Sequence, residues 1–381
     1  MQKKSASDSG TGTRPSDEQE VAFGSNEVRL SGRQWILAAA VILALFYLVP
    51  ALWKRIEKFD PGPDYRIPYS LSCDYWTYNR YCHQVCSQNK ALVIGDSVMW
   101  GHYVSKEQTL SHYLNELAGE DRFANLAVDG IHPAAMAGLI EYYGREITDK
   151  SIILQCNLLW MSSAKHDLQT EKEFSFNHPK LVPQFYPKIR CYTESYSGRV
   201  AIAIGRNMPF CGWVDHLRVA YFQDTNLHRW TIEHPYDNPI HAITLRLPSP
   251  NEPPSPRPVA EPWTEKRMAK FNPPWVELES SFQWKSFKRA VEILKRRKNR
   301  VFVLVGPFNE HMLTEDSLET YNKMKRDVED WLRKERIPHS VPAPLPSNYY
   351  ADASHPLSEG YAMLAKQLLQ NTSFFPFAQQ Q

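Results

Sequence analysis

The chain has 381 residues, enough for one large domain or two ordinary ones at roughly 150 residues per domain. Its 44 Lys and Arg residues nearly balance its 42 Asp and Glu residues, and the formal net charge of +2 argues against nucleic acid or another strongly charged partner. The 28 prolines are clustered, which favours long ordered loops over a wholly disordered chain.

The N-terminal region combines a polar tail with one long apolar segment. Residues 1–33 mix Ser, Gly, Glu, Asp and Lys without apolar periodicity and should form a disordered tail. Residues 34–53 contain no charged side chain, have the length of a helix that crosses a bilayer, and carry Trp35 and Trp53 where the two interfaces would lie. Lys54 follows directly in place of a small-residue cleavage site, so we expect an uncleaved membrane anchor.

The cysteines bear on the redox compartment. No C-x-x-C pair occurs, and the nearby histidines lack the spacing of zinc ligands, so we expect no metal site and no cofactor. The even count permits disulfide bonds outside the cytoplasm, for instance among Cys73, Cys82 and Cys86 and between Cys191 and Cys211. The alternative is that these five and Cys156 are buried thiols in a reducing compartment.

Two features point to opposite orientations of the anchor. More basic residues follow it than precede it, which favours a cytoplasmic C-terminal side. The disulfide bonds that the cysteines permit favour the other side. We predict an extracytoplasmic main domain.

From residue 91 onward, strand and helix patterns alternate. The preceding segment, 54–90, is rich in Tyr, Pro and Cys and should form an ordered stalk or cover. Short apolar runs predict strands at 91–94, 123–128 and 151–155, with a helix after each of the first two. Strands separated by helices of this size predict βαβ units and a parallel sheet.

The alternation stops between residues 163 and 275, where prolines and aromatic residues replace any clear period apart from a helical stretch near 212–222. We interpret this region as an insertion that lies over the active edge of the sheet and shapes substrate access.

The α/β pattern then resumes and closes the domain. Apolar runs predict strands at 301–305 and 337–341, and amphipathic patterns predict a helix before the first and a helix between the two. A last helix follows, with Ser358 as its N-cap. The α/β domain should therefore cover residues 91–372, which leaves 373–381 as a tail.

Polar residues stand where the first strand ends and where the last helix begins. Gly95, Asp96 and Ser97 form a tight turn directly after the first strand. Asp352 and His355 can hydrogen-bond through one imidazole nitrogen, which leaves the other nitrogen as a proton acceptor. Because the carboxyl ends of parallel strands share one edge, these residues fit the roles of nucleophile, base and orienting carboxylate in acyl transfer.

Acyl transfer also needs hydrogen-bond donors for the oxyanion of its tetrahedral intermediate. Three candidates end on the same edge: the backbone N–H of Ser97, the backbone N–H of Gly130 after the second strand, and the side-chain amide of Asn157 after the third. A turn glycine and a strand-end cap are the structural alternatives for Gly130 and Asn157.

Other residues near these turns are weaker candidates. His102 and His132 are close in sequence to the serine and glycine turns and could line the pocket, and Cys156 reads as a small buried hydrophobe. Further candidates for contact with substrate follow the fourth strand, namely Asn309, Glu310 and His311.

Together these blocks resemble the SGNH (GDSL-type) hydrolase superfamily over about residues 91–160 and 300–370. The resemblance implies a three-layer, flavodoxin-like α/β fold with helices on both faces of a parallel sheet. It also implies that Ser97 is the nucleophile, His355 the general base and Asp352 its orienting residue, and that Ser97, Gly130 and Asn157 form the oxyanion hole. The third block departs from the usual Gly-x-Asn-Asp, since it reads Gln155-Cys-Asn-Leu158, and the substrate class is therefore open.

The function implied is a membrane-anchored serine esterase that works through an acyl-enzyme, acting on an O-acyl ester of a carbohydrate or another cell-envelope component. Its partners would be that ester and, through residues 34–53, the lipid bilayer. One alternative is an O-acyltransferase that modifies a cell-envelope polysaccharide. Another is a binding module that keeps the fold without catalysis.

Overall fold

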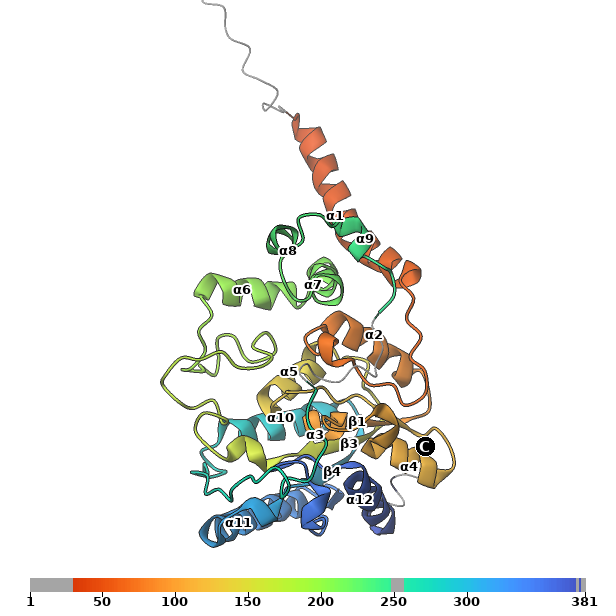
Figure 1. Cartoon of the computed structure of the whole chain (residues 1–381). Coiled ribbons are helices and arrows are strands. Elements are labelled where there is room, and N and C mark those ends of the chain that lie inside the picture. The colour runs from red at the N-terminus through yellow and green to blue at the C-terminus, as the bar shows by residue number, and fades with distance from the viewer. Residues whose placement is uncertain (1–29, 248–256, 375–376, 378–381) are drawn as a thin grey trace, which may run out of the picture. The chain divides into compact units, whose positions relative to one another are not determined.

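The computed structural model describes residues 30–247, 257–374 and 377. Its first element is the helix α1, Gly32–Ile56, which contains the predicted anchor and is long and apolar enough to cross a membrane (Figure 1). The chain divides into two units at Leu48 and Val49, and every strand among the described residues belongs to the second unit.

Five strands form one entirely parallel sheet in the order β2-β1-β3-β4-β5. The second strand is shorter than predicted, yet the N–H groups of Leu126 and Val128 still donate to the carbonyls of Val93 and Gly95, so the ladder continues past its end. The last strand has two residues in place of the expected five. The strands are β1 Ala91–Ile94, β2 Phe123–Asn125, β3 Ser151–Cys156, β4 Arg300–Val305 and β5 His339–Ser340.

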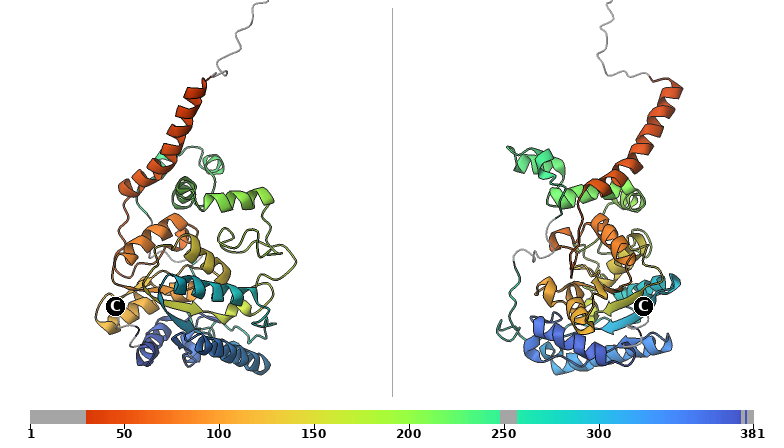
Figure 2. Two further views of the ribbon diagram at one scale, coloured as in Figure 1. Left: turned by 180° about the vertical axis from the view of Figure 1, so that it is seen from behind. Right: turned by 90° about the vertical axis from the view of Figure 1, so that its right-hand side faces the viewer.

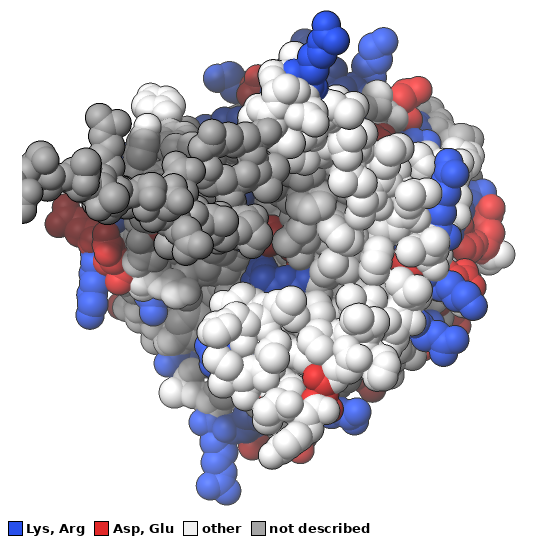
Figure 3. Space-filling model, turned by 90° about the horizontal axis from the view of Figure 1, so that it is seen from above, with Lys and Arg blue, Asp and Glu red and all other residues white. Residues whose placement is uncertain are grey.

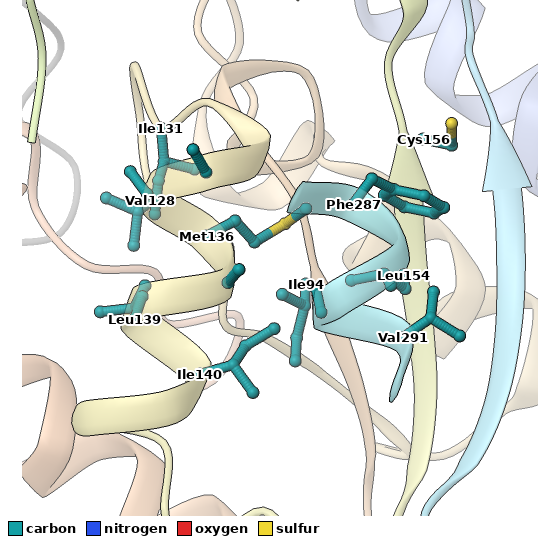
Figure 4. Close-up of a cluster of buried hydrophobic side chains, with 14 of the residues drawn as sticks. Ile94, Val128, Ile131, Met136, Leu139, Ile140, Leu154, Cys156, Phe287 and Val291 are labelled. Atoms are coloured by element: carbon teal, nitrogen blue, oxygen red, sulfur yellow. The ribbon is translucent and has the colours of Figure 1, made fainter. Parts of the chain in front are cut away.

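Alternating strand residues enter two separate hydrophobic clusters, because successive side chains of a strand point to opposite faces. One cluster joins Leu92 and Ile94 to α5 and α10 (Figure 4), and the other joins Ala91 and Val93 to α4 and α12. Figures 1 and 2 show α10 and α12 on opposite sides of the strands. The helices of this α/β part are α3 Ser97–Trp100, α4 Leu110–Ala118, α5 Pro133–Tyr142, α10 Phe282–Arg296, α11 Glu315–Lys334 and α12 Ser358–Gln370.

Residues 57–90 pack on the α/β core. They contain α2, Tyr75–Cys86, whose side chains Tyr78, Tyr81 and Cys82 are buried in the same cluster as α5 and α10. Arg66 is buried as well, and its guanidinium donates to the backbone carbonyls of Trp100 and Gly101 at 2.8 and 2.7 Å. This arginine ties the segment to the loop that follows α3.

The described residues of the predicted insertion, 163–247 and 257–275, contain four α-helices, of which the sequence indicated one. The helix expected near 212–222 is α7, whereas the others have too few buried positions to produce an apolar period. They are α6 Tyr196–Gly205, α7 Pro209–Tyr221, α8 Leu227–Glu233 and α9 Pro239–Ala242.

Two local expectations differ from the structure. Ser358 is the first helical residue of α12 and not its cap, which is Leu357; the serine hydroxyl instead lies 2.7 Å from the Tyr113 hydroxyl. All six cysteines are free thiols. The Cys82 and Cys86 sulfur atoms lie 3.9 Å apart, well beyond the roughly 2.05 Å of a disulfide bond. The structure therefore contains none of the disulfide bonds that the cysteines would permit.

Candidate active site

Ser97 occupies the first turn of α3, directly after β1. Asp96 caps this helix, since its Oδ1 accepts from the Val98 N–H at 2.9 Å. Gly95 has to be glycine, because a Cβ there would lie 2.3 Å from Met99 Cγ and 2.6 Å from Gln155 Oε1. The sharp turn presents the serine hydroxyl at the edge of the sheet, half-buried.

Ser97, His355 and Asp352 form a continuous hydrogen-bonded chain. Ser97 Oγ lies 2.8 Å from His355 Nε2, and His355 Nδ1 lies 2.8 and 2.9 Å from the two carboxylate oxygens of Asp352. With Nδ1–H donating to the carboxylate, Nε2 carries the lone pair that accepts the serine proton. The serine and the histidine are 258 residues apart in the sequence, and the fold brings them together at one edge of the sheet.

The loop around Asp352 is built to hold an ionised carboxylate. Its Oδ1 accepts from the backbone N–H groups of Ser354 and His355, each at 3.0 Å. Burial would raise the pKa of Asp352, but the positive His355 and these hydrogen bonds outweigh burial and lower it well below its usual range. Burial likewise would lower the pKa of His355, and the Asp352 carboxylate raises it above its ordinary value.

Asn309, in the segment that follows β4, supports the same loop. Its side-chain amide donates to the Asp352 carbonyl at 3.0 Å, and its backbone N–H donates to the Ala353 carbonyl at 2.8 Å. Asn309 is fully buried, so it positions the loop and does not face a substrate. Its neighbours turn elsewhere: Glu310 pairs with Lys325, and His311 Nε2 donates to the Leu345 carbonyl at 3.0 Å.

The three candidate oxyanion donors follow β1, β2 and β3. Gly130 has φ +70°, a backbone conformation that favours glycine, and a Cβ there would also lie 2.7 Å from Asn177 Nδ2. Among the residues that the structure describes, the backbone N–H groups of Ser97 and Gly130 donate to no protein acceptor. Asn157 donates one amide hydrogen to Asp96 Oδ2 at 2.8 Å, and its carbonyl oxygen accepts from the Leu159 N–H. The second amide hydrogen of Asn157 has no protein acceptor in the same described part.

The sequence did not predict the role of the Asp96 carboxylate, which binds two side chains that follow β3. The carboxylate is buried and accepts from the Asn157 amide and from the Trp160 indole N–H, both at 2.8 Å. Burial raises the pKa of Asp96, and the hydrogen bonds from Val98, Trp160 and Asn157 oppose that rise. Because the Asp96 carboxylate accepts one hydrogen of the Asn157 amide, it fixes the direction in which the other amide hydrogen points. In the sequence, the only indication of this role is that an acidic residue precedes Ser97, and an ordinary helix N-cap would also account for it.

A second imidazole–carboxylate pair lies beside the first. His102 Nδ1 donates to Asp129 Oδ1 at 2.6 Å, and the His102 ring centroid lies 5.2 Å from that of His355. Tyr103 completes this group, with its ring 5.5 Å from His355 and Lys266 Nζ 4.4 Å above it. Lys266 comes from the C-terminal end of the insertion, so that part of the insertion reaches the site.

His132 and Cys156 have structural environments. His132 caps α5, and its Nε2 donates to the Asn177 carbonyl at 3.2 Å while its Nδ1 accepts from the Ala135 N–H. Burial lowers the pKa of His132 to about 3, which keeps the ring neutral. Burial also raises the pKa of Cys156, so its thiol is not an activated nucleophile.

Within residues 30–247, 257–374 and 377, no group of three or more His, Cys, Asp or Glu side chains has an arrangement that could hold a metal ion. Compared with models of protein families, the chain matches none, and no curated protein matches it either.

Proposed function

We propose that the protein is a serine-dependent ester hydrolase that works through an acyl-enzyme. The observation that carries this proposal is the chain of short contacts from Ser97 Oγ through His355 to the Asp352 carboxylate. A hydroxyl, a basic imidazole and an ionised carboxylate in this order are the parts that activate a serine.

In the first half-reaction Ser97 Oγ attacks the ester carbonyl carbon while its proton moves to His355 Nε2. The oxyanion accepts hydrogen bonds from the Ser97 and Gly130 N–H groups and the Asn157 amide, each worth roughly 3–4 kcal/mol when pre-positioned. Collapse of this intermediate breaks the ester C–O bond, and the departing alcohol takes the proton from His355.

In the second half-reaction water attacks the acyl-enzyme carbonyl and gives a proton to His355. The second intermediate collapses to the free carboxylic acid, and Ser97 recovers its proton from the imidazole. Asp352 stays ionised throughout, because its pKa lies well below neutrality. Its charge stabilises the imidazolium of both halves and keeps the ring in the tautomer that exposes Nε2 as a base.

Labelling by a fluorophosphonate probe tests the proposal. The wild-type protein should form a covalent adduct at Ser97, and Ser97→Ala and His355→Ala should abolish it. Ser197→Ala, which removes an exposed serine on α6, is the matched control and should label normally. A wild-type Ser97 that does not react would overturn the esterase and leave a binding module without catalysis.

For the substrate we propose an O-acyl ester of a carbohydrate or another cell-envelope component. The half-buried rings of Tyr103 and Trp160 beside the site support it, since they offer apolar faces with polar edges. Release of acetate from an O-acetylated polysaccharide, lost in Ser97→Ala, would be the expected result. Turnover of simple esters with none on any acylated glycan would contradict this substrate class.

The second candidate is O-acyl transfer to a sugar hydroxyl. The His102–Asp129 pair favours it, because an oriented imidazole beside His355 has the chemistry to hold or deprotonate an acceptor hydroxyl. Incubating the acylated protein with and without a glycan acceptor separates the two reactions. Free acid without acceptor supports the hydrolase, whereas loss of the acyl group only with acceptor supports the transferase.

We also propose that the sheet and its helices form the three-layer, flavodoxin-like arrangement. The strand order β2-β1-β3-β4-β5 and the two hydrophobic clusters support this. In that order the chain changes direction between β1 and β3, and ligands bind at the carboxyl ends of such strands. Ser97 and Asn157 follow these two strands. An experimental structure with all helices on one face would contradict the arrangement.

A main domain outside the cytoplasm stays a prediction. Protease added to intact cells should degrade an extracytoplasmic domain and spare a cytoplasmic one, which would remain intact until the membrane is opened.

A further inference from the structure

The C-terminal end of α1 is built into the large unit through the insertion. Trp53 packs edge-on against Trp213 of α7, with ring centroids 5.5 Å apart. It also packs against a small hydrophobic cluster formed by Tyr221, Phe222 and Trp230. Helices α7 to α9 therefore surround the point where the apolar segment ends.

A buried cluster of polar side chains around Glu57 and His216 fixes the end of α1 against α7. Glu57, the residue after α1, accepts from the Trp53 indole at 3.1 Å, from His216 Nε2 at 2.7 Å, and from the Tyr221 hydroxyl. The Arg80 guanidinium pairs with its other oxygen. The side chains of Glu57 and His216 are fully buried, so α7 is held at a fixed height along the end of α1.

Large apolar side chains are exposed on the same helices. On α7 to α9 and their connections they are Val214, Leu227, Ile232, Tyr236 and Ile240, with exposed fractions from 45% to 99%, and we call this set the α7–α9 surface. In contrast, no large apolar side chain is exposed among the described residues from 269 onward. Figure 3, seen from above relative to Figure 1, shows uncharged residues over much of this face, with Lys and Arg residues around its edge and also near its centre.

We propose that the α7–α9 surface lies in the interfacial region of the lipid bilayer. If residues 34–53 cross the membrane, Trp53 stands at the interface, where indole rings concentrate. Side chains packed beside Trp53 then lie at the depth of the headgroups, and their exposed apolar neighbours enter the acyl boundary. The inference rests on the membrane span and not on ester hydrolysis.

The charge of the α7–α9 segment contributes little to this contact. Residues 209–247 contain three Arg, no Lys and four Asp or Glu residues, so the segment does not favour an anionic surface. Binding should therefore come from apolar burial and should not require anionic lipid.

Photolabelling of the full chain tests the proposal. The protein is reconstituted into phosphatidylcholine vesicles, an apolar carbene precursor that partitions into the bilayer is activated, and labelled peptides are measured by mass spectrometry. Peptides of α8 and α9 should be labelled severalfold more than α11 and more than the peptide of α4 that carries Leu117, an exposed apolar residue elsewhere. Raising the NaCl concentration to about 0.5 M should leave this pattern unchanged.

Variants sharpen the result. Ile232→Glu combined with Tyr236→Glu should reduce labelling of α8 and α9 severalfold and leave α1 labelled, whereas Leu117→Glu should change neither. Labelling of α8 and α9 at the level of α11 would overturn the proposal and leave the surface to a protein partner. An unlabelled α1 would overturn it through its premise. Fluorophosphonate reactivity of Ser97 is independent of all these outcomes.

Discussion

Two histidines of this molecule are held by carboxylates, and their surroundings differ in one respect. His355 donates to Asp352 at one nitrogen and faces the neutral Ser97 hydroxyl at the other. His216 donates to Asp74 and to Glu57, so both of its nitrogens meet carboxylates, each at 2.7 Å. The His355 side chain keeps 15% of its surface exposed, and the His216 side chain keeps none.

The difference explains why His355, and not His216, suits the proposed role of base. A histidine between two anions is stabilised as a cation, and its pKa rises to about 9 although burial alone would lower it. Such a ring has no lone pair to offer near neutral pH. His355 meets one anion and one hydroxyl, so its raised pKa is compatible with the proposed role of a base that can still exist unprotonated.

The largest effect should follow from removing the anion behind the base. We expect Asp352→Asn to lower kcat on p-nitrophenyl acetate by about 10⁴-fold, because the amide can stabilise the wrong tautomer and does not support the imidazolium. An unaltered thermal unfolding midpoint serves as the control for folding. A loss of less than tenfold would place the orienting role elsewhere.

The corresponding change at the other histidine should act on stability. His216→Gln leaves Glu57 and Asp74 buried without their shared cation, so the free energy of unfolding should fall by about 3–5 kcal/mol. Denaturant unfolding in detergent measures it, and the rate of fluorophosphonate labelling below the transition should stay within about twofold of wild type. A labelling rate that falls with stability intact would mean that the buried polar cluster around His216 is coupled to the site.

The two histidines should also respond to pH in opposite senses. For His216 the folded pKa of about 9 lies above an unfolded value of about 6.5, so its stabilisation, about 3 kcal/mol, is complete below pH 6.5 and lost as pH rises through 9. This dependence should disappear in His216→Gln. Over the same range kcat/KM should increase with pH, because His355 becomes a free base only above its raised pKa. A rate that falls as pH rises from 6 to 8 would exclude His355 as the base.

The smallest effect tests how the oxyanion hole is oriented. Asp96→Asn should lower kcat by about 10- to 100-fold, since the Asn157 amide loses its charged acceptor, whereas Asn157→Ala should cost about 10²–10³-fold by deleting the donor. KM and the stability of Asp96→Asn should change little. If Asp96→Asn is as damaging as Asn157→Ala, the carboxylate does more than hold the amide.

Several features could be predicted from the sequence because their signals are local. The apolar runs before Gly95 and after Arg300 identify β1 and β4, the uncharged stretch identifies the helix α1, and Pro133 marks the start of α5. Ser97, Gly130, Asn157 and the Asp352–His355 pair each follow a strand or precede a helix, so the parallel sheet alone brings them to one edge. Their catalytic roles stay predictions until they are tested.

Other features depend on contacts between segments far apart in the chain. The buried polar cluster around His216 of α7 also contains Glu57, Asp74 and Arg80, each more than 130 residues before His216 in the sequence. No residue type or spacing in the sequence predicts this cluster. Contacts between distant segments also determine three other features. They are the hydrogen bond from Asn157 to Asp96, the free thiols, and the exposed apolar side chains of α7–α9. Periodicity encodes which face of an element is buried, whereas the partner that each side chain meets is set only when the elements pack.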